Sequence, residues 1–152
     1  MPTFESAVDI RCEPHEAFEF LVRPANVVRV SPEAAGLRLV DAPERLELGS
    51  RVEFEVAAFG PAQRLVHEIV AFEEPTRFTE RQIKGPLKSF MHEHRIELLS
   101  DGMTRVIDAI AFEPPGGLVG FLVTAERILE SLRIGFEHRH REMKALLEGA
   151  GA

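Results

Sequence analysis

The stretch of residues 85–115 constrains the fold most, because it reads as two long strands joined by a tight turn. Side chains at alternate positions of a strand share a face. One face of the first strand therefore carries Phe90, His92, His94, Ile96 and Leu98, and one face of the second carries Thr104, Val106, Asp108, Ile110 and Phe112. Each of these apolar faces contains polar residues that need partners.

The turn sets how the two strands pair. A two-residue loop would lay the charged face of one strand against the apolar face of the other, which wastes both faces. A three-residue loop at residues 100–102, with the glycine in the left-handed region, instead pairs Leu99 with Met103. This register predicts that His94 and Asp108 are cross-strand neighbours on a mostly apolar surface.

Composition narrows the class of protein. A chain of 152 residues with 45% hydrophobic and 28% charged residues fits one globular domain. A net charge of −7 argues against nucleic-acid binding, since that needs a basic face. No apolar run approaches the length of a membrane span, and the polar N-terminus is no signal peptide, so a cytoplasmic location is expected. The single Cys12 excludes an internal disulfide and is expected to fill apolar space.

The remaining elements are read from periodicity and from turn residues. Residues 4–11 alternate as a first strand, and two short helices follow, the first from Pro14 to the stop at Pro24 and the second over residues 25–30. Six further strands are predicted at residues 37–41, 51–59, 63–72, 77–84, 87–99 and 103–112, of which the last two are the strands of the 85–115 stretch. Short connections imply an antiparallel meander, and the alternation around Phe54 indicates that one side of the sheet is covered.

The last segment can cover that side. Residues 118–147 carry one apolar stripe at helical spacing, which predicts a single long helix of about 45 Å. Arg139 falls inside the stripe, close to Phe121 and Leu132, and a guanidinium aimed at a core requires an anion. Residues 1–148 therefore form one predicted domain, and residues 149–152 are expected to fray.

This order of elements resembles the helix-grip fold of the START-related (SRPBCC) superfamily, which includes birch-pollen-allergen-like proteins, lipid-transfer domains and polyketide cyclases. The resemblance spans nearly the whole chain and is greatest to a bacterial group of small ligand-binding members. Its motif corresponds here to Gly85-Pro86, Phe90, His92, His94, Ile96, Thr104, Asp108, Phe136 and Arg139. Phe90 stands where tryptophan is more usual, and Met103 separates the turn glycine from Thr104, but neither departure alters the charge of the site.

The resemblance implies an α+β fold in which a seven-stranded antiparallel curved sheet wraps around the long C-terminal helix and leaves an elongated cavity. Such a cavity typically holds an apolar or amphipathic small molecule, such as a lipid, an aromatic or a polyketide-like compound. The residues expected to contact it are Phe54, Phe78, Glu80, Phe90, His92, His94, Asp108, Phe136 and Arg139. The register between residues 77–84 and the His92 strand stays open, because the Gly85-Pro86 turn fits more than one length.

Each polar residue also has a plainer interpretation. His94 bonded to Asp108 would satisfy a core histidine, and Arg139 could form a salt bridge to Asp108 or Glu80. His92, His94 and a carboxylate could supply three metal ligands, but the acids suit Arg139 equally and the fold implied by the resemblance carries no usual metal. We therefore expect no metal and no cofactor, in a monomer or a homodimer.

Two other functions compete with ligand binding. The first is a cyclase or dehydratase that uses the same pocket, with His94 and Asp108 as the candidate general base. No serine or cysteine nucleophile lies in a recognisable elbow motif. The second is a protein-interaction or chaperone-adaptor module. The other histidines, His15, His67, His138 and His140, are not expected to take part in the site.

Overall fold

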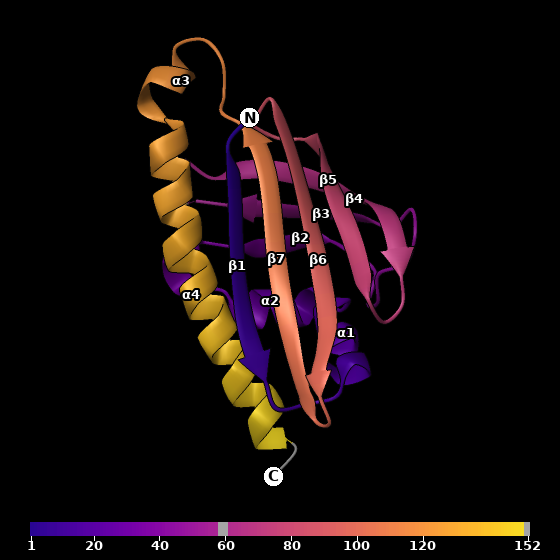
Figure 1. The fold of residues 1–152 in the computed structure, drawn as a ribbon. Helices are drawn as coiled ribbons and strands as arrows, with labels where there is room; N and C mark the ends of the chain where they lie inside the picture. The colour runs from indigo at the N-terminus through magenta and orange to yellow at the C-terminus, as the bar shows by residue number, and fades with distance from the viewer. Residues whose placement is uncertain (58–60, 151–152) are drawn as a thin grey trace.

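A computed structural model of the chain describes residues 1–57 and 61–150, and its strands form one antiparallel sheet (Figure 1). The sheet has seven strands in the order β1-β7-β6-β5-β4-β3-β2. Their bounds are β1 Thr3–Ile10, β2 Arg38–Asp41, β3 Arg51–Val56, β4 Gln63–Glu73, β5 Arg77–Lys84, β6 Ser89–Ser100 and β7 Met103–Glu113. The predicted meander is confirmed from β2 to β7, and β1 pairs with β7 across the chain. The predicted end of the third strand at Phe59 lies outside the described residues.

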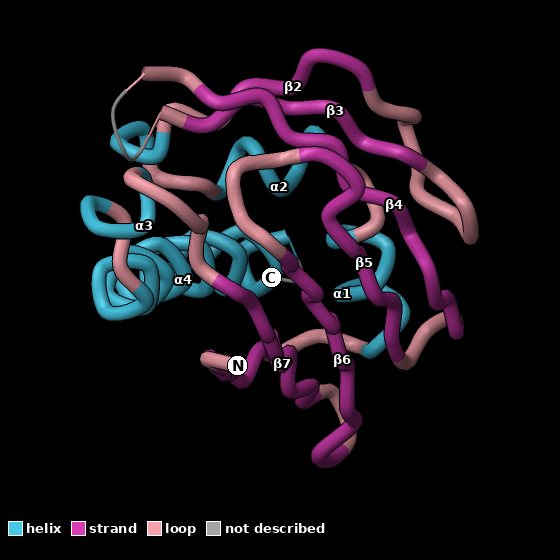
Figure 2. Tube along the Cα trace, turned by 90° about the horizontal axis from the view of Figure 1, so that it is seen from above, coloured by secondary structure: helices cyan, strands magenta, loops and turns pink. Residues whose placement is uncertain are grey.

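The sheet is strongly curved, and its helices lie within the curve (Figure 2). They are α1 Pro14–Leu21, α2 Pro24–Val30, α3 Val119–Leu122 and α4 Ala125–Ala150, with a short 3-10 helix at Glu33–Ala35. A helix inside a curved sheet covers one face of each strand, so alternate side chains are buried. On β7 this face carries Thr104, Val106, Asp108, Ile110 and Phe112, all buried. The predicted helix-grip architecture is confirmed.

The hairpin of β6 and β7 has the predicted register over most of its length. His94 lies opposite Asp108, as expected. The loop itself differs from the prediction, because Ser100 and not Leu99 pairs with Met103, and the register shifts between Leu98 and Ser100. Leu99 is therefore an extra residue of β6 and forms a bulge in that strand. Gly102 takes the left-handed backbone (φ 73°) that the tight turn requires.

The C-terminal segment is not the single helix that was predicted. α3 ends at Leu122, and α4 begins at Ala125 after a break at Val123 and Thr124. The Thr124 hydroxyl accepts a hydrogen bond from the Arg127 backbone N–H (3.2 Å), which is the action of a helix N-cap and ends the preceding turn.

The break changes which side chains are covered. Leu118, Phe121 and Leu122, which the apolar stripe placed on the core face, are 84%, 81% and 71% exposed. At the other end, α4 continues through Gly149, which was expected to fray, and residues 151–152 lie outside the described chain. No described helix combines the length and hydrophobicity needed to cross a membrane.

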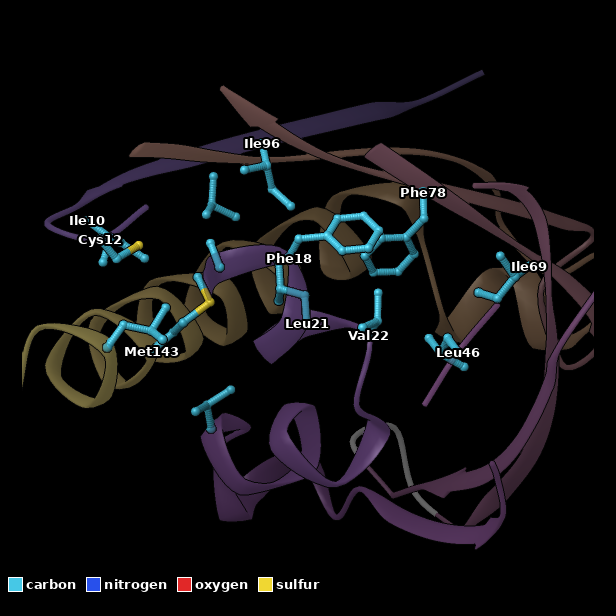
Figure 3. Close-up of a cluster of buried hydrophobic side chains, with 14 of the residues drawn as sticks. Ile10, Cys12, Phe18, Leu21, Val22, Leu46, Ile69, Phe78, Ile96 and Met143 are labelled. Carbon is cyan, nitrogen blue, oxygen red and sulfur yellow. The ribbon is translucent and has the colours of Figure 1, made fainter. Parts of the chain in front are cut away.

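A dry apolar core fills the part of the interior around α1 (Figure 3). The Glu13 backbone N–H donates to the Glu16 side chain in a capping box, which fixes the start of α1 at Pro14. This places Phe18 edge-on against Phe72 and Phe78, with ring centroids 5.3 and 5.7 Å away. Cys12 is buried at the edge of this core, as predicted.

Candidate functional site

Buried polar residues gather on the concave face of the sheet, where β5, β6 and β7 run side by side. His94 pairs with Phe78 of β5 on one side and with Asp108 of β7 on the other. Glu80 lies opposite His92. The register across the Gly85-Pro86 turn, which the sequence left open, therefore brings Glu80 beside both histidines.

Asp108 is the centre of the cluster and is only 2% exposed. Its Oδ1 accepts a hydrogen bond from His92 Nε2 (2.7 Å), and its Oδ2 accepts one from His140 Nε2 (2.6 Å). Burial by itself would raise the pKa of Asp108, but the imidazoles of His140, His92 and His94 outweigh burial and hold the pKa well below its ordinary value. Asp108 is therefore an ionised carboxylate inside the protein.

His94 does not make the hydrogen bond that was considered for it. Its Nδ1 lies 3.3 Å from Asp108 Oδ1 without hydrogen-bond geometry, and neither ring nitrogen has a hydrogen-bond partner within the described chain. The ring is instead stacked between Phe78 (4.1 Å between centroids) and His92 (3.8 Å). Stacking fixes the plane of the His94 imidazole. The hydrogen bonds to the Asp108 carboxylate come from His92 and His140 instead.

The charge on His94 follows from its two acidic neighbours. Burial lowers the pKa of this imidazole, but Asp108 and Glu80 together overcome burial and raise the pKa to about 9. His94 is therefore cationic at neutral pH in the absence of any other positive charge, although it is only 4% exposed.

Glu80 is the second carboxylate of the site. Its Oε1 accepts a hydrogen bond from His92 Nδ1 (3.1 Å) and lies 3.8 Å from His94 Nε2 and 3.7 Å from His67 Nδ1. Burial favours a raised pKa, but the imidazoles of His67, His92 and His94 reverse that effect and place the pKa of Glu80 well below its ordinary value. One carboxylate oxygen is thus surrounded by three imidazoles.

Two residues of the cluster, His67 and His140, were missed in the sequence. His140 is buried, bonds to Asp108 and lies 3.4 Å from the Ser6 hydroxyl through its other ring nitrogen. It follows Phe136 by four positions, which is one helical turn, and the two rings are in contact. His67 alternates with the buried Leu65 and Ile69 on β4. The four-residue spacing from Phe136 and the alternation with Leu65 and Ile69 can both be read from the sequence.

Arg139 reaches the interior but forms neither of the salt bridges considered for it. Its guanidinium donates to the Ser31 hydroxyl (3.3 Å) and lies 4.6 Å from the centre of the Phe136 ring. Within the described chain no carboxylate lies within ion-pair distance of Arg139. Burial lowers the pKa of Arg139, and the more distant Asp108 and Glu80 partly offset this effect.

Three adjoining cavities run between the sheet and the helices. The first, of about 100 Å³, lies beside α2, and the second, of about 240 Å³, lies beside α4. A third, of about 470 Å³, extends towards α3, and Leu65, Phe90 and Leu132 line both the second and the third.

All the predicted contact residues except Asp108 line the first or second cavity: Phe54, Phe78, Glu80, Phe90, His92, His94, Phe136 and Arg139. Asp108 lies behind His92 and does not reach the cavity wall. The chemistry of the wall is therefore that of an apolar channel with cationic and carboxylate groups near its middle.

Comparisons with known proteins agree with this architecture. The profile of the family described as "Polyketide cyclase / dehydrase and lipid transport" matches residues 1–148. No curated protein matches the sequence at a significant level.

Several solved structures share the fold at low sequence identity. The protein TTHA0849 from Thermus thermophilus is similar with a TM-score of 0.76 at 16% identity, over 99% of this chain and 100% of that one. The major latex-like protein 151 from Panax ginseng has a TM-score of 0.66 at 20% identity, over 96% of this chain and 97% of that one. The protein CV1439 from Chromobacterium violaceum has a TM-score of 0.74 at 12% identity, over 97% and 99%.

Proposed function

This chain belongs to the polyketide cyclase / dehydrase and lipid transport family, and we propose that it binds a small apolar or amphipathic molecule between the sheet and α4. The apolar body of the ligand lies in the second and third cavities. Its polar end, an acidic group, lies at Arg139. Pockets for small molecules commonly combine an apolar wall with a few polar groups that orient the ligand.

The observation that carries this proposal is the position of Arg139. Its guanidinium lines the first and second cavities without a carboxylate partner among the described residues, whereas Glu80 and Asp108 are already surrounded by imidazoles. A partly buried guanidinium is stable when an anion or a strong acceptor faces it. A ligand with a carboxylate or enolate end supplies that acceptor, and its chain extends away from α2 towards α3.

The test compares two probes that differ only in the polar end, decanoate and decanol. Isothermal titration of the native chain should detect both, with decanoate bound more tightly. Arg139→Gln should weaken decanoate at least tenfold and leave decanol within about twofold, since only the acid pairs with the guanidinium.

The matched control is Arg141→Gln, two residues away at an exposed position of α4, where the guanidinium hydrogen-bonds to His138. This variant should bind both probes like the native chain. Equal affinity of the native chain and Arg139→Gln for decanoate would refute the assignment of the acidic end, and failure of the native chain to bind either probe would refute ligand binding by this cavity.

A second candidate function is dehydration of a bound ligand, which the family description includes. The supporting observation is that His94 has no hydrogen-bond partner in the described chain and lines the first cavity. With a pKa of about 9 it holds a proton at neutral pH, so in the metal-free chain it would act as a general acid that protonates the hydroxyl as the C–O bond breaks. The Glu80 carboxylate, which lines the same cavity, would take the proton from the neighbouring carbon, whereas the general base first considered was His94 itself. His92 is less suited to proton transfer, because both its ring nitrogens face carboxylate oxygens.

A further inference from the structure

The donor atoms around Glu80 are arranged as metal ligands are. Glu80 Oε1 lies 3.1 Å from His92 Nδ1 and 3.8 Å from His94 Nε2, and one donor atom from each of the three residues lies within 4.8 Å of the others. A tetrahedral ion with bonds of about 2.1 Å separates its ligand atoms by about 3.4 Å. The observed separations lie on both sides of that value, but the two imidazoles are stacked with centroids 3.8 Å apart and planes 27° from parallel, so the rings must move apart before both nitrogens point at one ion.

The donor types indicate which ion would bind. Two imidazoles and one carboxylate suit divalent zinc and neighbouring transition metals, and they do not suit calcium or magnesium, which prefer oxygen ligands. His67 Nδ1 lies 3.7 Å from the same Glu80 oxygen but does not belong to the set of donor atoms that lie within 4.8 Å of one another, so the fourth position is open to a water or a ligand. The single Cys12 lies in the dry core, so the site contains no sulfur.

Asp108 gives this cluster the outer support that metal-binding histidines usually have. It accepts from His92 Nε2 at 2.7 Å, on the opposite side of the ring from the nitrogen that faces Glu80. Its Oδ1 also lies 3.3 Å from His94 Nδ1, while His94 Nε2 is the nitrogen that faces Glu80. A carboxylate behind a histidine fixes the ring and directs the lone pair of the other nitrogen towards a metal. Asp108 makes this hydrogen bond to His92, whereas it lies beside His94 Nδ1 without hydrogen-bond geometry.

More of the buried polar atoms have partners when an ion is bound than when the site is empty. His92 can satisfy both carboxylates only as a donor at each nitrogen, and buried His94 Nε2 has no partner in the described chain although it points towards Glu80. With an ion bound, His92 Nδ1, His94 Nε2 and Glu80 Oε1 become ligands, and the remaining N–H groups face Asp108. The double charge of the ion also compensates two buried carboxylates.

We propose that Glu80, His92 and His94 bind a divalent zinc-type ion, with Asp108 as the residue that orients His92. The entry path is the first cavity, which Glu80 and His94 line. This site does not depend on the ligand proposed above, because it is formed by the strands alone.

The test is zinc binding by the full chain, purified without a histidine tag, stripped with EDTA and exchanged into chelator-free buffer. Titration with Zn²⁺ against a chromogenic chelator should give one ion per chain with submicromolar affinity, and elemental analysis after buffer exchange should give the same ratio. Glu80→Gln and His94→Asn should each weaken zinc binding at least tenfold, and Asp108→Asn should also weaken it, since outer residues typically contribute about tenfold or more.

His15→Asn, at an exposed position on α1, is the matched control and should leave zinc binding unchanged. Circular dichroism and the melting temperature in EDTA show whether each variant folds, and zinc should raise the melting temperature of the native chain but not of Glu80→Gln. Absence of a stoichiometric ion, or zinc binding that Glu80→Gln and His94→Asn leave intact, would overturn the proposal. Arg139→Gln should retain zinc, so failure of the metal site and failure of the ligand site are read separately.

Discussion

The two halves of α4 face the same curved sheet, but one half packs into a filled apolar core and the other half borders a cavity. The C-terminal half packs Met143 and Leu147 into the dry core of Figure 3, together with Phe18 from α1. The N-terminal half presents Phe136 to the second cavity, and Arg139, just past the middle of the helix, lines the same cavity. At one end, Phe18 of α1 packs against Phe72 and Phe78 of the sheet, whereas the second cavity stays open beside α4 at the other.

The polar cluster lies at the boundary between these two regions. His94 stacks on Phe78, which itself packs against Phe18 of the dry core, and His92 contacts Phe136 of the hollow half edge-on. Buried charges are thus held in place by close packing on one side and face open volume on the other. A rigid wall beside an unfilled space is what a binding site for a small molecule or an ion requires.

The largest difference between the two halves should appear on truncation of a phenylalanine in each. Phe18→Ala removes a fully buried ring and leaves a void, so we expect a loss of about 3–5 kcal/mol in the free energy of unfolding. Phe90→Ala, at the cavity wall, enlarges an existing space around a ring that is only partly buried, and should cost about 1–2 kcal/mol. Urea unfolding followed by circular dichroism measures both values. Equal losses would show that the hollow half is packed as tightly as the dry half.

The contribution of His94, at the boundary between the two regions, to the free energy of unfolding should depend on pH. The folded-state pKa of His94, about 9, lies above its ordinary value of 6.5, so its contribution to stability is complete below pH 6.5 and is lost as the pH rises through 9. The full contribution amounts to about 3 kcal/mol. Urea unfolding between pH 6 and pH 10, with EDTA present, should therefore show declining stability in the native chain.

The matched variant for this measurement is His94→Gln, which should remove most of the decline. His15→Gln, exposed on α1, should keep it. A native chain whose stability is flat from pH 6 to pH 10 would contradict a buried imidazolium. At the acid end, the lowered pKa values of Glu80 and Asp108 predict the opposite sign, with stability lost as the pH falls below about 4.

The smallest effect is expected at α3, beyond the hollow half. Phe121 and Leu122 are mostly exposed, so Phe121→Ser and Leu122→Ser should each change the free energy of unfolding by no more than about 0.5 kcal/mol. Ile128→Ser, at a buried position of α4 in the adjoining apolar cluster, is the control that should destabilise clearly. A loss above about 1 kcal/mol at Phe121 would show that α3 packs against the rest of the protein.

Much of the fold could be predicted from period and turn chemistry alone. The sheet, its meander and the His94 and Asp108 pairing follow from alternation, because a shift by one residue would expose the whole apolar face. The break at Thr124 could not be obtained in the same way. The apolar stripe continues through it, and the bond of the Thr124 hydroxyl to the Arg127 N–H, which caps the start of α4, leaves no mark in that pattern.

The site was less accessible to prediction than the fold. The face shared by His92, His94 and Asp108 could be read from the hairpin, but the identity of the hydrogen-bond partners depends on ring orientations that neighbours in three dimensions decide. His140 of α4 bonds to Asp108 in place of His94, and His94 is held instead by stacking on Phe78. A wheel of α4 placed Arg139 at the interior correctly but could not show that Ser31, rather than an acid, would meet it.

The bonds of Asp108 have a consequence for the order in which the chain folds. Its partners His92 and His140 lie 16 and 32 residues away, and His140 in turn reaches Ser6 across 134 residues. Contacts at such separations form late, because loop closure must precede them. During synthesis on the ribosome, a chain whose α4 is still in the exit tunnel would hold Asp108 with only one of its two hydrogen bonds. The polar cluster behind the pocket wall is therefore complete only once α4 has packed against the sheet.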